Sequence, residues 1–294
     1  MSPAPRASRE PSLQVLGEIN VDLVARVERP PQPGEMVVDG QLTRVPGGKG
    51  ANQAAVAARL GARVLMIGAV GRDATGMEMR RALERDGVST AAVQDTSEAT
   101  GTAFIIVDSA GDSTLVVSRG ANEAIEAGRL SVDPHAALLA HLDVGAFVVE
   151  RAAARTDGLV VLDCSTPADI SSALLDRADV IVTRTSCLEH LPMGDRGTLV
   201  AGIVDGGGAV LRRGENEIAR VDARVFDGPN PVGARDAFSA ALTIGFLRGW
   251  SEDEVLHAAC AVAAAAVADR GSRPQLDGLD AYRSGVAAIA DGGR

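Results

Sequence analysis

The sequence predicts an α/β protein in three layers, with helices on both faces of a largely parallel sheet. Two observations predict this class. Short apolar runs alternate with segments of helical periodicity along most of the chain, which is typical of βαβ units. Residues 36–45 and 101–120 instead alternate with a period of two, so we expect them to form antiparallel strands of a small separate sheet.

The N-terminal half begins with a segment unlike the rest. Residues 1–12 are rich in Pro, Ser and Arg and lack apolar periodicity, which predicts a disordered tail before a single domain over 13–290. The elements that follow are predicted from apolar runs, helical periods and terminal glycines. In order they are a strand at 13–19, a helix at 50–62, a buried strand at 63–71 and an amphipathic helix at 75–88.

The C-terminal half repeats this pattern before it changes. Residues 156–165, 171–184 and 196–213 each predict a helix–strand alternation that extends the parallel sheet. Residues 233–250 and 251–271 are Ala-rich and predict two long helices.

Charge and composition exclude several classes of partner. The net charge is −10, from 29 Lys and Arg against 39 Asp and Glu, so phosphate backbones and anionic lipid surfaces would be repelled. Aromatic residues make up 2% of the chain, which leaves few platforms for stacked bases. No apolar run approaches the roughly 20 residues that cross a bilayer. We therefore expect neither a nucleic-acid partner nor a membrane segment.

The cysteines predict no structural bonds. Cys164, Cys187 and Cys260 are odd in number, widely spaced and far from any His-rich cluster. They indicate reduced thiols in a cytoplasmic protein, without a disulfide framework or a dedicated metal site.

A glycine-rich stretch, residues 47–53, follows a short strand and opens an Ala-rich helix. Its three glycines leave the amides at the helix N-terminus open to a polar ligand, to which Lys49 and Asn52 can donate hydrogen bonds. A plain glycine-rich helix start with a surface lysine fits the same residues. No P-loop motif occurs in the chain, so this is not a Walker site.

Residues 17–22 form a second candidate site at the end of the first strand. Asn20 and Asp22 are two apart, so they point the same way from an extended segment and suit the vicinal hydroxyls of a sugar. An Asx turn fits them equally well.

Residues 230–238 form a third candidate, where a loop enters a helix. The amides of Gly233, Ala234 and Arg235 at the positive end of that helix form an anion site. Asp236 at its mouth can take a proton from an attacking hydroxyl. Alternatively, Asp236 only stabilises its own helix.

Together, the three stretches resemble the ribokinase-like (PfkB) family of carbohydrate kinases, over nearly the whole chain after the tail. Residues 47–53 match the family's first signature, and residues 17–22 and 100–122 are similar to its sugar-side segments. The resemblance implies a three-layer α/β/α domain with a small β-sheet that serves as a lid over the sugar. It implies lid strands from about 18–25, 36–45 and 101–118.

The resemblance also implies chemistry. The family transfers the γ-phosphate of ATP to a sugar hydroxyl, usually with Mg²⁺ and often with a monovalent cation. Asp236 corresponds to the catalytic base, and residues 263–276 resemble the segment that lines the adenine and cation sites. The implied sugar-binding residues are Asn20, Asp22, Gly48, Lys49, Asn52 and Asp143, the last in place of a glutamate. The implied partners are a small sugar or ribosyl substrate and a second copy of the chain, because lid strands in this family often pair between subunits.

The departures from the family pattern lie on the nucleotide side. The second signature, D-T-x-G-A-G-D, has Asn230 in place of the first acid, which does not favour a monovalent-cation site, and Arg235 in place of the last glycine. The N-x-x-E motif that orders Mg²⁺ is replaced by residues 183–187, Thr-Arg-Thr-Ser-Cys. The strand expected to carry a nucleotide contact has the divergent sequence of residues 211–216.

Two functions remain open at this point. The first is ATP-dependent phosphorylation of ribose or a ribosyl compound, with Asp236 as general base and Arg235, Arg184 and Arg212 supplying fixed positive charge. The alternative is a diverged protein of the same fold that keeps the sugar pocket without transferring phosphate. It would bind a ribosyl ligand or perform another reaction.

Overall fold

The computed structural model describes residues 11–38, 40–164, 170–191, 197–204, 207–222, 231–268 and 274–284. Within these ranges, nine strands form a large sheet. They are β1 (Ser12–Leu16), β4 (Arg63–Gly71), β5 (Ser89–Thr96), β8 (Ala137–His141), β9 (Val160–Asp163), β10 (Val180–Arg184), β11 (Leu199–Ile203), β12 (Ala209–Arg213) and β13 (Asn216–Val221).

The large sheet runs in the order β13-β12-β11-β10-β9-β8-β1-β4-β5. All its pairs are parallel except β11 with β12 and β12 with β13. The carboxyl ends of the parallel strands therefore meet at one edge, which is where open α/β sheets bind ligands.

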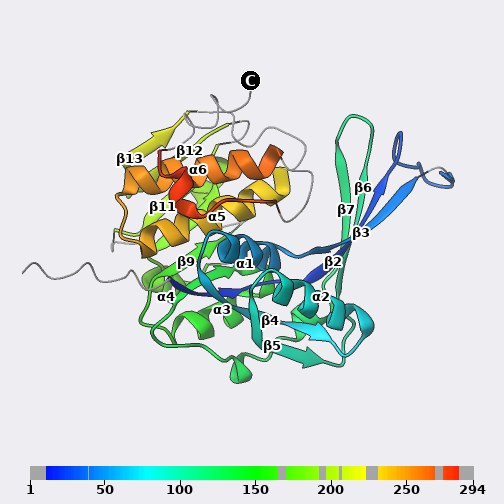
Figure 1. Ribbon diagram of the computed structural model, residues 1–294, viewed down its shortest axis with the longest axis horizontal. Coiled ribbons are helices and arrows are strands. Elements are labelled where there is room, and N and C mark those ends of the chain that lie inside the picture. The colour runs from blue at the N-terminus through cyan, green and yellow to red at the C-terminus, as the bar shows by residue number, and fades with distance from the viewer. Residues whose placement is uncertain are drawn as a thin grey trace, which may run out of the picture.

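A four-stranded sheet, which we call the lid sheet, projects from the body beside the large sheet (Figure 1). Its order is β3-β2-β6-β7, and β6 and β7 form the predicted antiparallel hairpin. The strand expected over 36–45 begins later, at Gln41. The bounds are β2 (Asn20–Arg26), β3 (Gln41–Gly47), β6 (Gly101–Val107) and β7 (Ser113–Ser118).

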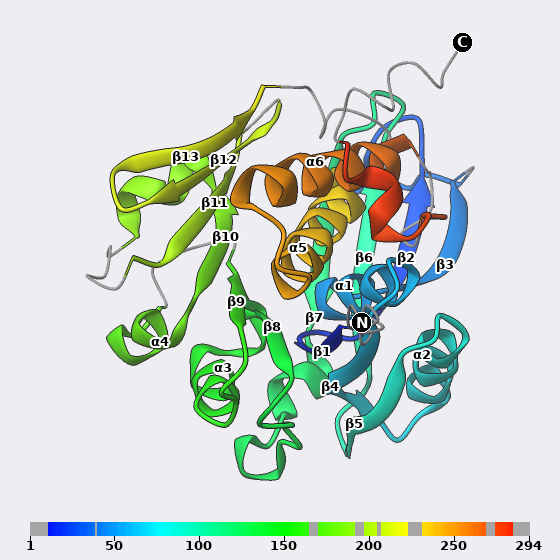
Figure 2. The same ribbon diagram turned by 60° about the vertical axis from the view of Figure 1, so that its left-hand side comes forward.

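Helices cover both faces of the large sheet, so the predicted three-layer α/β fold is confirmed. The α-helices are α1 (Lys49–Arg59), α2 (Ala74–Arg85), α3 (Ala146–Ala153), α4 (Ser172–Arg177), α5 (Pro231–Leu247) and α6 (Glu252–Ala268). Short 3-10 helices are η1 (Gly120–Ala124), η2 (Ala127–Arg129), η3 (Leu142–Val144), η5 (Thr185–His190) and η6 (Leu279–Tyr282). Figures 1 and 2 both show α1, α5 and α6 lying together.

One hydrophobic core lies on each face of the large sheet. Because side chains alternate along a strand, neighbouring residues of a strand belong to opposite cores. In β8, Leu139 belongs to the core under α1, α2, α5 and α6, whereas Leu138 and Ala140 belong to the core under α3 and α4. Small side chains let α5 and α6 pack closely, since Ala240 and Ala259 are fully buried. With few aromatic residues, close packing of aliphatic side chains fills the interior.

Two sequence expectations differ from the structure. Residues 196–213 were expected to hold a helix and a strand, but β11 and β12 form an antiparallel pair there. A short apolar run of this kind fits either element by periodicity alone. Ser12, expected to end the tail, already pairs with Arg63 in β1. In the part of the chain described, no helix combines the length and apolarity needed to span a bilayer.

Candidate functional site

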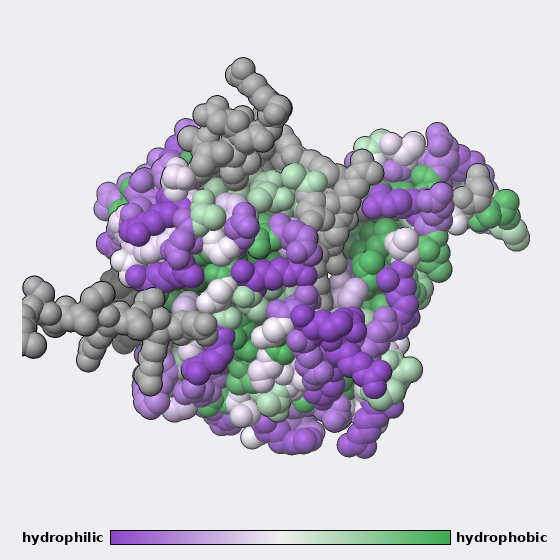
Figure 3. All heavy atoms as spheres, in the orientation of Figure 1, coloured by the Kyte–Doolittle hydropathy of each residue, from purple (hydrophilic) through white to green (hydrophobic). Residues whose placement is uncertain are grey.

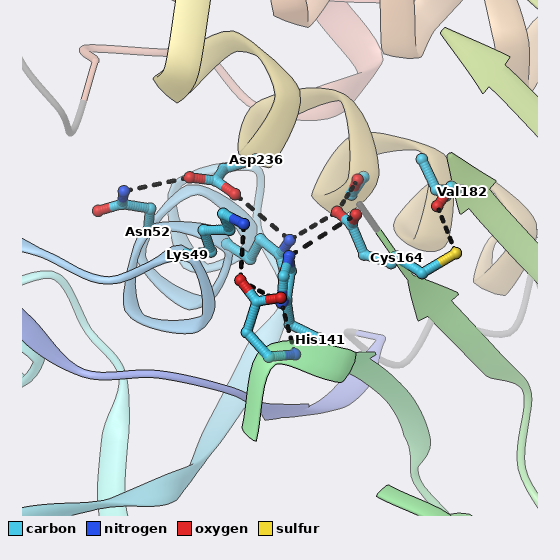
Figure 4. A network of polar contacts seen from close by, with 10 residues as sticks. Lys49, Asn52, His141, Cys164, Val182 and Asp236 are labelled. Carbon is cyan, nitrogen blue, oxygen red and sulfur yellow. Dashed lines mark hydrogen bonds and ion pairs between the residues drawn. The ribbon is translucent and has the colours of Figure 1, made fainter. Parts of the chain in front are cut away.

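The candidate site lies at the carboxyl edge of the large sheet, between the first turns of α1 and α5. Strands β1, β8 and β9 deliver Glu18, Asp143 and Asp163 there, while α1 carries Lys49 and α5 carries Asp236. These residues come from distant parts of the sequence and meet because parallel strands end at one edge of the sheet. Figure 4 shows the polar network around Lys49, Asn52, His141 and Asp236.

Glycine is required at the turn before α1. Gly48 has φ of +89°, and a side chain there would place its Cβ 2.6 Å from the carbonyl oxygen of Glu18. A side chain at Gly47 would overlap the carboxylate of Asp22. The turn thus brings the backbone of the glycine-rich stretch against both Asp22 and the residues after β1.

Lys49 and Asp143 form an ion pair, with 2.7 Å between Nζ and Oδ2. Burial disfavours the charge on Asp143, but His141 and the hydrogen bond from Lys49 outweigh burial and lower the pKa of this carboxyl. The backbone amide of Asp143 donates to Nδ1 of His141 at 3.2 Å. The structure therefore places Asp143, a predicted sugar-binding residue, directly beside Lys49.

Asp236 is almost completely buried, at 3% exposure, and receives two hydrogen bonds from α1. Asn52 Nδ2 donates to its Oδ2 at 3.1 Å, and Gln53 Nε2 donates to its Oδ1 at 3.4 Å. Burial, followed by the nearby charge of Asp163, raises the pKa of Asp236 well above its usual range. A carboxyl with a raised pKa in a buried polar site suits proton transfer near neutral pH.

The side-chain amides of Asn52 and Gln53 donate through their nitrogens, but their oxygens accept no hydrogen bond from the described residues. In the described part of the structure, Asn52 Oδ1 and Gln53 Oε1 are buried and have no hydrogen-bond partner. Buried polar atoms without partners are uncommon and costly, so these two oxygens are candidate acceptors for hydrogen bonds from a ligand.

Asp163 is a site residue that the sequence did not reveal. Its Oδ2 accepts from Gln53 Nε2 at 2.8 Å and from Ser239 Oγ at 2.6 Å, and its Oδ1 lies 3.9 Å from His141 Nε2. Burial lowers the pKa of His141, while the neighbouring charge of Asp163 acts in the opposite direction. The available signal was an aspartate at the end of an apolar strand, in the run VVLD.

Asn20 and Asp22 lie on β2, at the base of the lid sheet. Asn20 is buried, at 4% exposure, and its Oδ1 accepts from Asn122 Nδ2 at 2.7 Å. Asn122 also accepts from the amide of Ile19 at 2.9 Å, so it fixes the chain between β1 and β2. Sequence reasoning missed Asn122, which lies in η1 about a hundred residues away.

The residues of the predicted anion site lie at the start of α5. Gly233 and Ala234 are buried and Arg235 is half-buried, one turn from the helix start at Pro231. Amides in a first helical turn have no partner within the helix, which makes this end favourable for anions. Asn230, and with it the question of a monovalent cation, lies outside the described residues.

The arginines expected near the phosphates lie on different faces. Arg184 ends β10 in the row of Val180 and Val182, which pack in the core under α5 and α6. Arg212 pairs with Val200, which belongs to the opposite core. The structure therefore brings Arg184 but not Arg212 to the side of α5. Residues 211–216, expected to contact nucleotide, end β12 and turn into β13.

Arg212 instead lines a separate cavity of about 330 Å³ together with Thr185 and Arg220. Within the described ranges, no group of three or more His, Cys, Asp or Glu side chains lies close enough together to hold a metal ion.

Comparisons with known proteins agree on one family. The family model described as pfkB family carbohydrate kinase matches residues 10–183. Ribokinase of Haemophilus influenzae is 30% identical over 292 residues, which cover 90% of this chain and 95% of that protein.

Solved structures extend the likeness to the whole fold. A structure of Arabidopsis thaliana ribokinase complexed with ribose and ATP has a TM-score of 0.76 at 26% identity, covering 94% of this chain and 98% of that one. A nucleoside kinase of Methanocaldococcus jannaschii, a member of the ribokinase family, shares the fold with a TM-score of 0.78 at 18% identity, covering 94% and 98%.

Proposed function

Since the chain belongs to the pfkB family of carbohydrate kinases and is a ribokinase-like sugar kinase, we propose that it phosphorylates a hydroxyl of ribose or a ribosyl compound, with ATP as the donor. Support for the acceptor and the donor comes from the relatives. Several are named ribokinase, and one was solved with ribose and ATP.

The acceptor sugar would lie between the lid sheet and the first turn of α1. Asn20 and Asp22 come from β2, and Gly48 and Asn52 from the glycine-rich turn and α1. The Lys49–Asp143 pair lies at the same start of α1. Asp22 lies against Gly47, so the carboxylate and the glycine-rich backbone face the same space. Asn52 Oδ1, buried without a partner in the described structure, offers an acceptor to a sugar hydroxyl.

The proposed general base is Asp236, and its environment is the observation that carries the mechanism. The carboxylate is held by Asn52 and Gln53, and its pKa is raised by burial and by Asp163. It accepts the proton of the attacking hydroxyl while the hydroxyl oxygen forms a bond to the γ-phosphorus. The bond from that phosphorus to the bridging oxygen breaks, and ADP leaves with the electron pair.

The phosphates would be held by the start of α5. The amides of Gly233 and Ala234 and the side chain of Arg235 supply donors there, and Arg184 adds positive charge from β10. Phosphoryl transfer depends mainly on positioning and charge stabilisation, so fixed arginines can take over part of what the family's N-x-x-E motif supplies. Mg²⁺ would enter with ATP as part of the substrate.

We also propose that two copies associate through the lid sheet. Phe104 and Val116 are directly opposite in the β6–β7 pairing, and they are 50% and 66% exposed. Leu42 on β3 is 68% exposed. Figure 3 shows hydrophobic residues on this projecting sheet. Apolar surface of this kind on a projecting sheet favours an interface with a second copy.

Direct product analysis tests the proposed function. The purified chain is incubated with MgATP and, separately, with ribose, other pentoses, hexoses and ribonucleosides, and phosphorylated products are identified by mass spectrometry and phosphorus NMR. Phosphorylation of ribose or a ribosyl compound is expected. Sugar binding without phosphoryl transfer to any acceptor would instead support the diverged alternative.

A further inference from the structure

Glu18 has a largely buried side chain beside the proposed acceptor site, and the proposed mechanism does not use it. It lies two residues after the end of β1 and is only 6% exposed. Its carbonyl oxygen accepts from the amide of Ala51 at 3.1 Å, which ties its backbone to the first turn of α1. Glu18 lies in the link between β1 and β2, two residues before Asn20.

Among the described residues, none of the charged neighbours of Glu18 forms a hydrogen bond with its carboxylate. Asp143, Lys49 and Arg119 are its charged neighbours; burial and Asp143 raise its pKa, while Lys49 and Arg119 lower it. Lys49 Nζ already contacts Asp143 at 2.7 Å, and Arg119 lies 3.9 Å from Glu123 on the surface. Across the residues described, no hydrogen bond to the Glu18 carboxylate is found.

The carboxylate of a side chain that is only 6% exposed loses most of its hydration, and a ligand that donates a hydrogen bond to it offsets that loss. Its charged neighbours include the Lys49–Asp143 pair, which borders the proposed sugar site. Resting on the proposed function, we propose that Glu18 is a specificity-determining residue that accepts a hydrogen bond from a hydroxyl of the acceptor sugar.

Glu18 then favours polyhydroxylated acceptors because it disfavours two kinds of sugar. A sugar that lacks the contacted hydroxyl leaves the carboxylate unpaired in a buried site, so such a sugar binds poorly. Glu18 also adds a third carboxylate to Asp22 and Asp143, which disfavours sugars that carry a phosphate or carboxylate at this end.

This assignment is tested by measuring whether the loss of affinity on removing one sugar hydroxyl depends on the Glu18 side chain. Sugar binding is measured by titration calorimetry, without nucleotide, for the wild type, Glu18→Ala and Glu18→Gln, with ribose and each of its monodeoxy analogues. Glu28→Gln is the matched control, because Glu28 is an exposed glutamate near the lid sheet. Thermal melting by circular dichroism checks that each variant folds.

For one hydroxyl, we expect its removal to weaken binding to the wild type by about tenfold or more, the usual worth of a hydrogen bond to a charged group. The same removal should weaken binding to Glu18→Ala by less than about twofold. Glu18→Gln keeps an acceptor oxygen without the charge, so removal of the same hydroxyl should weaken binding to it by an intermediate factor. This variant tests the assignment if Glu18→Ala fails to fold. Glu28→Gln should behave as the wild type.

The outcomes separate this inference from the function on which it rests. If the wild type binds sugar but no hydroxyl couples to Glu18, the assignment of Glu18 is overturned and the proposed function stands. If the wild type binds no ribosyl compound at all, both are overturned.

Discussion

Asn52 Nδ2 lies 3.1 Å from Asp236 Oδ2, which joins two helices whose residues are 184 positions apart in the chain. Through this hydrogen bond, the helix that begins at the glycine-rich turn orients the buried acid of α5. The side chain of Asn52 faces the acid with its amide nitrogen and keeps its oxygen without a partner in the described structure. Asn52 therefore links the proposed acceptor site to the proposed base.

Asp163→Asn should change the pH dependence of catalysis. The pKa of Asp236 is raised by burial and then by the charge of Asp163, so removing that charge lowers it. Because the base must be ionised, the acid limb of the kcat profile should move to lower pH. The exposed Asp157→Asn is the control and should leave the limb in place. A limb that stays fixed or moves to higher pH in Asp163→Asn would show that Asp163 does not act on the base.

Asn20→Ala and Asp22→Ala should weaken sugar binding by about 1–3 kcal/mol each, since polar partners of the sugar are left unpaired. The effect should appear in the sugar KM and in calorimetric affinity, with little change in the KM for ATP. Asn122→Ala distinguishes direct contact with the sugar from positioning of Asn20, because Asn122 Nδ2 donates to Asn20 Oδ1 at 2.7 Å. Unchanged sugar affinity in both Asn20→Ala and Asp22→Ala would place the pocket elsewhere.

The helix start at the glycine-rich turn and the helices on both faces of the large sheet were predictable because each leaves a local pattern. Glycines at a helix start and apolar periodicity can be recognised in one segment. Asp163, His141 and Asn122 could not be found this way. Each is a single polar residue in an ordinary segment, and only the pairing of parallel strands or the packing of η1 brings it to the site.

The strands over 196–213 were mispredicted for a related reason. A five-residue apolar run next to glycines fits a buried helix turn or a strand equally well, and the antiparallel pairing of β11 with β12 decides between them. The lid sheet was easier to predict because alternation with a period of two is distinctive in exposed strands.

Arg235→Gly should lower kcat/KM for ATP by at least about tenfold, if the guanidinium binds the transferred phosphoryl group. The sugar KM should change little. Arg81→Gly, which alters an exposed arginine in α2, is the control for loss of helix propensity. Tighter ATP binding by Arg235→Gly would mean that Arg235 occupies the phosphate space, and this result cannot be reconciled with a role as phosphate ligand.

Phe104→Asp should weaken association of two copies through the lid sheet, because it places a charge in an apolar interface. Sedimentation velocity over a range of concentrations measures the effect. Phe147→Asp is matched to it, since Phe147 is 67% exposed on α3 outside the lid sheet. A monomeric wild type, or equal effects of the two substitutions, would refute the proposed interface.

The proposed base is tested most directly by comparing Asp236→Asn with the wild type in single-turnover phosphorylation of ribose at saturating MgATP. Asp157→Asn serves as the control, and sugar affinity is measured in parallel. We expect Asp236→Asn to lose at least about 10²-fold in rate, the usual lower contribution of a general base, while its affinity for ribose stays close to that of the wild type. An Asp236→Asn variant that keeps more than about a tenth of the wild-type rate would contradict Asp236 as the base.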